Sequence, residues 1–316
     1  MLRKLINFLK NWTLPSAIVG GAGLYFLFAS IPAIDAFSTT AGQVFDEVLP
    51  WFLFVILFTT FLKIDYKQLR FEKWHFWMCF TQLFMVFTLV GCVLYFHIDG
   101  PDLVLMECVI TCVIGPCAAA SAVVTAKLGG SLESMTTYTF VSNSLTAILI
   151  PLCFPLIDHN VVMDFGTAFL MIMSKVCMIL VVPMALAYVV KRLLPQFQRL
   201  VVAQTDLSFY LWGCSLAIVT GITFRNIMHS DAPLSLLGTI AVVRFVLCAP
   251  QFSVGRNVGH FFGRTVEGGQ GLGQKNTAFA IWVSSAYLHP LAAVGPGCYI
   301  IWQNAINSLE LYHKRP

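Results

Sequence analysis

The chain has 316 residues, of which 58% are hydrophobic and 11% are charged, and its mean hydropathy is +0.80. A soluble domain of this length does not need such a composition, so the sequence excludes a soluble protein and indicates a polytopic helical membrane protein. The formal net charge of +4 fits basic cytoplasmic loops and does not indicate a nucleic-acid partner.

Ten apolar segments, each close to the roughly 20 residues that cross a bilayer, are the predicted membrane spans. An amphipathic helix over residues 1–12 precedes them and is expected to lie at the membrane interface. We place the spans at residues 14–34, 46–63, 74–96, 102–128, 132–157, 165–191, 201–224, 235–259, 266–288 and 290–311.

The loops between these spans differ in their basic residues. With both termini in the cytoplasm, most of the 19 Lys and Arg residues fall in cytoplasmic segments, whereas the outer loops hold only Arg225. The positive-inside rule therefore predicts a multi-pass protein of the plasma or inner cell membrane, with both termini in the cytoplasm.

Sequence motifs of enzymes are missing from the chain. It has no His-Glu-x-x-His, no Gly-x-Ser-x-Gly and no Gly-x-x-x-x-Gly-Lys-Ser/Thr, and its 10 cysteines form no Cys-x-x-Cys or Cys/His ligand set. We therefore expect neither an enzyme nor a nucleotide-driven pump, and we expect no metal or cofactor.

Two of the predicted spans contain residues that interrupt helices. The fourth has Gly115 and Pro116 at its centre, and proline removes a backbone donor and clashes with the preceding turn. The ninth begins with a glycine-rich run, and we expect its interruption at Gly271 and Gly273. Lys275 follows directly, although a lysine at this depth costs roughly 2.5–3.5 kcal/mol on insertion scales. A plain helix kink, with Lys275 reaching a lipid headgroup, is the simpler alternative.

The interruptions fall in corresponding spans of two halves, residues 13–160 and 161–311. Because each half has an odd number of spans, the two halves have opposite orientations in the membrane. Paired interruptions of this kind indicate a transporter site at the bilayer midplane. The predicted fold is therefore all-α, with ten transmembrane helices in two inverted five-helix repeats.

Three segments resemble motifs of the bile acid:sodium symporter family. They are GPCAAASAVVT at Gly115–Thr125, GLGQKNTAFA at Gly271–Ala280 and YIIWQNAINS at Tyr299–Ser308. Their order and spacing are similar to the family over nearly the whole chain. The resemblance implies a panel of spans 1, 2, 6 and 7 and a core of spans 3, 4, 5, 8, 9 and 10 with crossed helices 4 and 9. It also implies transport of organic anions by alternating access.

The resemblance further implies a first sodium site, from which the chain departs. Ser121 and Thr139 are kept as possible oxygen ligands. Three other ligand positions carry residues without a suitable oxygen, namely Ala122, Met135 and Gly271. Sodium needs several oxygen ligands, preferably including a carboxylate, so we expect this site to be lost.

At the second sodium site that the resemblance implies, Gln82 is kept and Gln274 is close in sequence, but Lys275 takes the position of a glutamine. An ammonium there would repel sodium by several kcal/mol. We therefore predict sodium-independent transport in which Lys275 supplies the positive charge. Three roles stay open for Lys275: a fixed partner of the substrate or of Glu107, a group that exchanges a proton, or a static brace between helices.

Amide side chains near the interruptions are the predicted substrate contacts, because they bind a carboxylate or hydroxyl without a charge of their own. Asn276 and Asn304 match positions that line the substrate cavity in the family, and Gln303 precedes Asn304. Ala119 and Ser121, in the fourth span, complete the predicted set.

The leading hypothesis is a monomeric secondary transporter of bile-acid-like or small carboxylates, with the organic anion, the lipid bilayer and a proton as partners. A sodium-coupled organic anion symporter with an atypical site is one alternative, and a transporter-derived receptor or inactive relative is another. Two more intramembrane cations, Lys175 and Arg244, either pair inside the bundle or reach headgroups, and the sequence does not decide between these arrangements.

Overall fold

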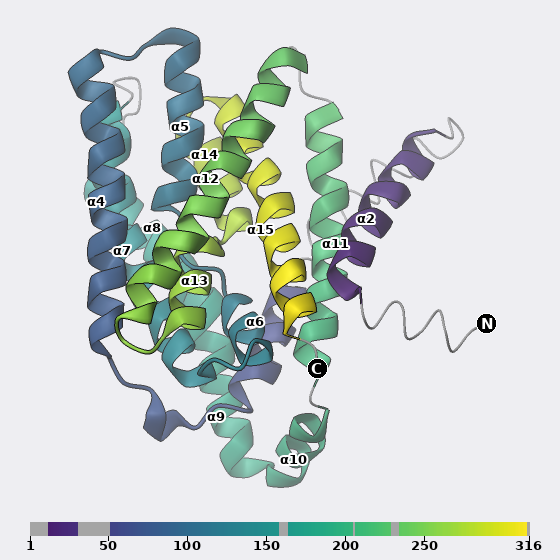
Figure 1. Cartoon of the computed structure of the whole chain (residues 1–316). Helices are drawn as coiled ribbons and strands as arrows, with labels where there is room; N and C mark the ends of the chain where they lie inside the picture. Colours follow the sequence, from purple (N-terminus) through teal and green to yellow (C-terminus); the bar gives the residue numbers. More distant parts are fainter. Residues whose placement is uncertain (1–11, 31–50, 158–163, 205, 229–233, 315–316) are drawn as a thin grey trace. The chain divides into compact units, whose positions relative to one another are not determined.

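The computed structural model describes residues 12–30, 51–157, 164–204, 206–228 and 234–314, whose helices are shown in Figure 1. The predicted interfacial helix at 1–12 lies almost wholly outside the described residues, as do parts of the predicted spans 14–34 and 46–63.

Within the described residues the fold is all-helical, with one isolated β-bridge and no named strand. By length and composition, five of its helices can cross a membrane, and two shorter ones are also apolar. The five are Lys73–Phe96, Leu132–Ile157, Phe165–Leu193, Leu207–Arg225 and Leu237–His260, and the shorter two are Thr13–Ala29 and Trp51–Phe61. These helices indicate a membrane-embedded protein.

The chain divides into two compact units. The first comprises residues 1–64, 179–229 and 304–316, and the second comprises residues 65–178 and 230–303. The boundaries fall inside the predicted spans 6 and 10, so the division into a panel and a core of whole spans stays a prediction.

The first unit contains α2 (Thr13–Ala29), the helix Trp51–Phe61, α9 (Val182–Leu193), α10 (Pro195–Ala203) and α11 (Leu207–Met228). Small residues allow α2 and α11 to pack closely, because a Cβ on Gly21 would collide with the backbone of Ala217. The seventh predicted span begins later than expected, at Leu207, because α10 is a separate helix that ends at Ala203.

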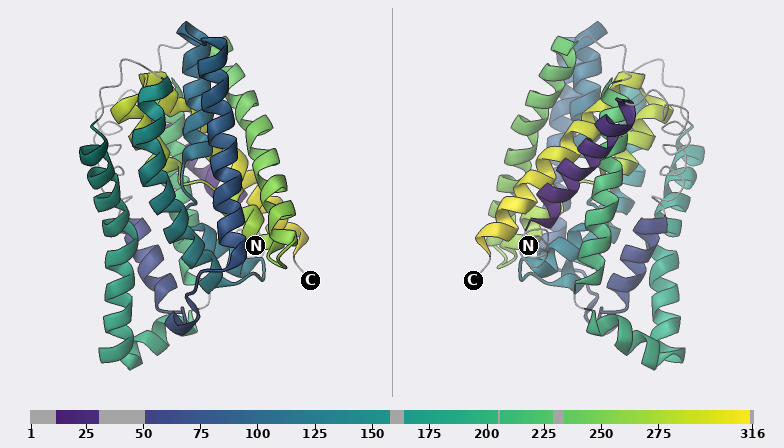
Figure 2. Two further views of the ribbon diagram at one scale, coloured as in Figure 1. Left: turned by 90° about the vertical axis from the view of Figure 1, so that its left-hand side faces the viewer. Right: turned by 90° about the vertical axis from the view of Figure 1, so that its right-hand side faces the viewer.

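The second unit carries the interrupted spans. It contains α4 (Lys73–Phe96), α5 (Gly100–Ile114), α6 (Ser121–Lys127), α7 (Leu132–Ile157), α8 (Phe165–Val176), α12 (Leu234–His260), α13 (Thr265–Gly273), α14 (Thr277–Tyr287), the 3-10 turn η4 (Pro290–Ala293) and the first part of α15 (Val294–His313). Figure 1 shows α13 packed beside α12, and Figure 2 shows α4 and α5, in blue, side by side. The predicted spans 102–128 and 266–288 are therefore two pairs of half-helices, α5 with α6 and α13 with α14.

Candidate functional site

The first break lies between α5 and α6. Helix α5 ends at Ile114, and Gly115 turns into an extended conformation with ψ of 140°. A residue that precedes proline is biased towards this conformation, because the proline ring clashes with an α-helical neighbour. Gly115 and Pro116 therefore lie in the non-helical stretch that ends where α6 begins at Ser121.

The second break begins directly after its glycines, at Gln274. We expected it at Gly271 and Gly273, but both residues are helical, and α13 continues to Gly273. The non-helical residues are Gln274, Lys275 and Asn276, after which the Asn276 side chain accepts a hydrogen bond from the N–H of Phe279 at 3.1 Å. Asn276 is thus the N-cap of α14.

Close packing explains why the glycines stay helical. A Cβ on Gly271 would lie 2.8 Å from a ring carbon of Tyr138, and a Cβ on Gly273 would enter the ring of Phe252. A Cβ on Gly268 would collide with the backbone carbonyl of Gly255. The run therefore lets α13 approach α12 and α7 closely, and this close packing offsets the poor helix propensity of glycine.

The two breaks cross and hydrogen-bond to each other. Cys117 and Lys275 form an isolated antiparallel bridge. The N–H of Ala118 donates to the carbonyl of Gln274 at 2.9 Å, and the N–H of Asn276 donates to the carbonyl of Pro116 at 2.9 Å. These bonds satisfy backbone groups that hydrocarbon could not satisfy, so the crossing is stable at membrane depth.

The ammonium of Lys275 lies at the carboxyl end of α5. Its Nζ donates to the carbonyls of Val113 at 3.1 Å and of Gly115 at 3.0 Å, and the residue is 1% exposed. The last carbonyls of a helix have no partner within the helix and carry the negative end of its dipole. Lys275 therefore occupies a place where carbonyl oxygens and the helix dipole both favour a cation.

Gln82, on α4, binds the same carbonyls. Its Nε2 donates to Val113 at 3.2 Å, to Ile114 at 3.1 Å and to Gly115 at 3.3 Å. The carbonyl oxygens at the end of α5 are therefore already bound by an ammonium and an amide.

Glu107 and Lys275 have different hydrogen-bond partners. A carboxylate oxygen of Glu107 accepts from the N–H of His289 at 3.3 Å, and the residue is 1% exposed. Glu107 lies in the middle of α5, whereas the bonds of Lys275 go to carbonyls at the carboxyl end of that helix. The pairing of Lys275 with Glu107 stays a prediction, because these hydrogen bonds join each of the two residues to other partners.

Polar residues of α7 support the first break. The hydroxyl of Ser142 accepts from the N–H of Cys117 at 3.0 Å, and the amide of Asn143 donates to the Cys117 carbonyl at 3.4 Å. The hydroxyl of Thr146 donates to the carbonyl of Ile114 at 2.8 Å. The sequence left Asn143 open as either a ligand or a residue that packs helix on helix, and it did not single out Ser142 and Thr146, although these two have the spacing of one helix face.

Residues of α15 support the second break in the same way. The hydroxyl of Tyr299 donates to the carbonyl of Gly273 at 2.8 Å. The Oε1 of Gln303 accepts from the N–H of Lys275 at 2.9 Å, and its Nε2 donates to the Lys275 carbonyl at 3.3 Å. Behind them, Gln251 of α12 donates to the Tyr299 hydroxyl at 3.2 Å. The fifth and tenth predicted spans thus each hold the break of the span before them.

An apolar cluster occupies the positions where the resemblance implies the first sodium site. Ala122 and Met135 belong to a buried hydrophobic cluster together with Trp74, Tyr138 and Leu272. The Tyr138 ring fills the space beside Gly271. Carbon atoms therefore surround the positions that would have to supply sodium with oxygen.

The other predicted site residues make contacts within the protein. Ser121 is buried, and its hydroxyl contacts the thiol of Cys117 at 2.9 Å, while the Thr139 hydroxyl donates to the Met135 carbonyl at 2.9 Å. Gln274 is 1% exposed, and its Oε1 has no hydrogen-bond partner among the described residues.

Two further residues that were predicted to contact the substrate, Ala119 and Asn304, are buried. Ala119 is 8% exposed in the first break, and Asn304 is 1% exposed in the part of α15 that belongs to the other compact unit. Asn304 directly follows Gln303 on α15, and its role as a substrate contact stays a prediction.

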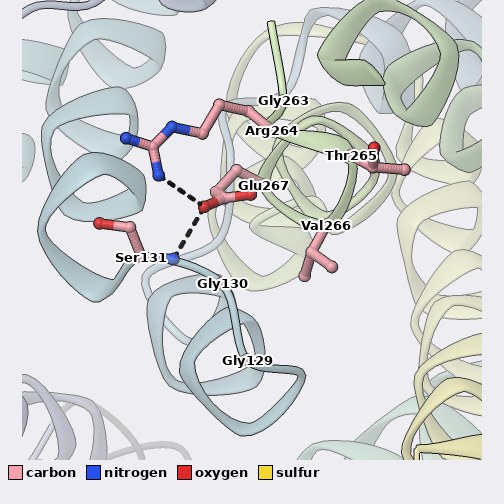
Figure 3. A pocket seen from close by; sticks show the side chains of 8 residues that line it. All are labelled: Gly129, Gly130, Ser131, Gly263, Arg264, Thr265, Val266 and Glu267. Carbon is pink, nitrogen blue, oxygen red and sulfur yellow. Dashed lines mark hydrogen bonds and ion pairs between the residues drawn. The ribbon is translucent and has the colours of Figure 1, made fainter.

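A polar pocket of about 470 Å³ lies at the ends of α6 and α13 that are remote from the breaks. In Figure 3, Glu267 accepts from the N–H of Ser131 at 2.7 Å and from Arg264 at 3.3 Å. Arg264 also forms a two-point ion pair with Glu72, at 3.0 and 3.1 Å. These bonds join the loop after α6 to the loop before α13, and none of the predicted site residues lies here.

A family model described as the sodium bile acid symporter family matches residues 50–230 of the chain. The matched residues include the first break and end before α12, so the second break and Lys275 lie outside the match. No curated protein matches the chain.

Proposed function

Because the chain belongs to the sodium bile acid symporter family, we propose that it is a secondary transporter of organic anions in which Lys275 takes the place of the bound cation. The observation that supports this proposal most directly is the position of the Lys275 ammonium, which donates hydrogen bonds to the carbonyls of Val113 at 3.1 Å and of Gly115 at 3.0 Å. These are backbone oxygens freed by a helix break, which are the groups that transporters use to bind sodium.

Electrostatics supports the exclusion of a second cation. Two unit charges 4 Å apart repel by about 4 kcal/mol at an effective dielectric constant of 20. Sodium near Lys275 would also have to compete with the Gln82 amide for the same carbonyls. A sodium gradient then has no ion to act on, so transport proceeds at the same rate with or without sodium.

The apolar cluster around Ala122 and Met135 supports the same conclusion for the first sodium site. A hard cation needs oxygen ligands, and the Tyr138 ring lies where a longer side chain at position 271 would have to extend. Neither site that the resemblance implies is then suited to sodium.

Inverted repeats with alternating access are part of this proposal. They are supported by the parallel roles of α7 and α15, whose Thr146 and Tyr299 each donate to the last carbonyl of the half-helix before a break. The cross-break bonds at Ala118 and Asn276 would make the crossing move as one body. Asn276 and Ser121, which lie at the crossing, are the proposed substrate contacts.

Uptake into proteoliposomes tests the proposal, with cholate, pyruvate and pantoate as probes and either sodium or choline as the external cation. The wild type is expected to take up at least one probe equally in both. Lys275→Gln removes the built-in charge, and its uptake is expected to be lost or to become dependent on sodium. Lys175→Gln is a matched control, because Lys175 lies over the Trp282 ring at 3.3 Å, away from the breaks.

Two results would contradict the proposal. Wild-type uptake that rises steeply with sodium would mean an ordinary symporter with an atypical site. Binding of a probe without any uptake would favour a receptor derived from a transporter. Repeating the assay with an imposed proton gradient shows whether a proton accompanies the anion.

A further inference from the structure

Arg244 is the second fully buried cation of the unit that contains the crossing. It lies in the middle of α12 and is 0% exposed. None of its three guanidinium nitrogens, Nε, Nη1 and Nη2, has a hydrogen-bond partner among the described residues. A buried charge without partners is strongly unfavourable, so such a residue is retained for a reason other than stability.

The guanidinium lies against the amino end of α15. A Cβ on Gly295, the second residue of that helix, would be 2.7 Å from Nη2 and 3.0 Å from Cζ. The glycine therefore provides the space in which the guanidinium lies. Helix α15 has 20 residues, and its amino end carries the positive end of the helix dipole, although the Val294 N–H is already bonded to the carbonyl of Leu291 and Pro296 has no N–H.

Two positive groups thus meet at one buried place. They repel each other, and both favour an anion between or beside them. The thiol of Cys108 lies within hydrogen-bonding reach of both the Arg244 guanidinium and the Gly295 N–H, and the thiol of Cys298 lies within electrostatic range of Arg244. Thiols are weak hydrogen-bonding groups and do not replace an oxyanion.

Helix geometry separates Arg244 from the crossing. Arg244 precedes Gln251 on α12 by two turns, about 10 Å along the helix axis, and Gln251 is bonded through Tyr299 to the end of α13. Arg244 therefore offers an anion-binding group distinct from Lys275.

We propose that Arg244, beside the positive end of the α15 dipole, forms a subsite for the carboxylate or sulfonate group of the transported anion. The planar guanidinium can donate two parallel hydrogen bonds to such a group, which a lysine cannot do. The inference rests on the proposed function for the source of the anion, but the Arg244 geometry stands without it.

Thermal unfolding of the purified full chain tests this subsite with Arg244→Met, Arg244→Lys and the control Lys175→Met. The first measurement uses no organic anion. Removing a buried charge that lacks partners is expected to raise the Tm of Arg244→Met by about 2 °C or more. A fall in Tm of Arg244→Met would instead identify a structural brace, with Glu107 on α5 as its counterpart, and would overturn the inference.

The second measurement adds cholate or taurocholate, as carboxylate and sulfonate probes, and cholamide as an uncharged counterpart. The wild type and Lys175→Met are expected to be stabilised equally by the anions. Arg244→Met should bind them about 30-fold or more weakly, which is the loss expected when one partner of a buried charge pair is removed. Arg244→Lys should retain part of the response, and binding of cholamide should be unchanged.

An undiminished response of Arg244→Met to both anions would also overturn the subsite. If no organic anion binds or is taken up by the wild type, the proposed function fails. The Tm of Arg244→Met without anion then still tests the inference about Arg244, because that measurement requires no substrate.

Discussion

Two buried cations of one compact unit, Lys275 and Arg244, have opposite surroundings. Lys275 is 1% exposed and donates to two carbonyls at 3.0 and 3.1 Å, whereas the 0% exposed Arg244 has no hydrogen-bond partner among the described residues. A cation whose ligands come from the protein is a permanent part of the fold. A cation without them indicates a ligand that comes from outside.

Backbone geometry explains the difference. Lys275 lies on one helix break and reaches another, where the carbonyls of α5 have no helical partner. Arg244 lies in the middle of the continuous helix α12, where the carbonyls of the helix interior bind its own N–H groups. Helix breaks therefore provide the oxygen ligands for a cation, and continuous helices do not.

The largest expected effect comes from Lys275→Met. It removes two hydrogen bonds from a charged donor, so the free energy of unfolding should fall by about 3 kcal/mol. Arg244→Met should change stability in the opposite direction. Denaturant or thermal unfolding of both variants in the same detergent measures these opposite changes in stability. A loss of stability in both variants would contradict the expected difference between Lys275 and Arg244.

A smaller loss of stability is expected from Gly271→Ala, which changes the packing of α13, the helix that leads to Lys275. Its Cβ would lie 2.8 Å from the Tyr138 ring, and overpacking of this kind costs about 1–3 kcal/mol. Gly91→Ala is the matched control, because a Cβ there has open space and should be neutral or slightly stabilising. Equal Tm values for the two variants would show that Gly271 is not needed for close packing.

The smallest effect on stability is expected from Gly295→Ala, a substitution of the glycine that lies against the Arg244 guanidinium. The new methyl group would push the end of a flexible side chain, at 2.7 Å from Nη2, so Tm should change by about 1 °C or less. Affinity for cholate should fall about tenfold, because the guanidinium leaves the helix terminus. Titration by isothermal calorimetry checks this, and unchanged affinity would separate Gly295 from the subsite.

The sequence predicted the order of the helices well, because long apolar runs and proline leave strong local signals. The described α-helices coincide with the predicted spans to within a few residues at their ends, apart from α10 and the late start of α11. Lys275 was identifiable from a charge among apolar residues. The second break begins at Gln274, directly after the glycines at which it was expected, because those glycines stay helical where they pack against Tyr138, Phe252 and Gly255, which are distant in sequence.

The supporting residues were harder to predict. Ser142 and Thr146 are ordinary polar residues until the carbonyl and N–H groups of the first break are placed beside them. The sequence identified Arg244 as an intramembrane charge without deciding between pairing and reaching a headgroup, and only its tertiary surroundings show that it is buried without hydrogen-bond partners within the described part of the chain.

The glycine contact between α12 and α13 has a mechanical consequence. Backbone touches backbone where Gly268 meets Gly255 and Gly259, so these two helices cannot slide past each other without separating. Arg244 is on one of them, and the other ends two residues before Lys275. A displacement of Arg244 on α12 should therefore be transmitted through α13 to Lys275, and the reverse. A double-mutant cycle between Arg244 and Lys275 measures this coupling. Strictly additive changes in the free energy of unfolding would mean that the two residues are not coupled.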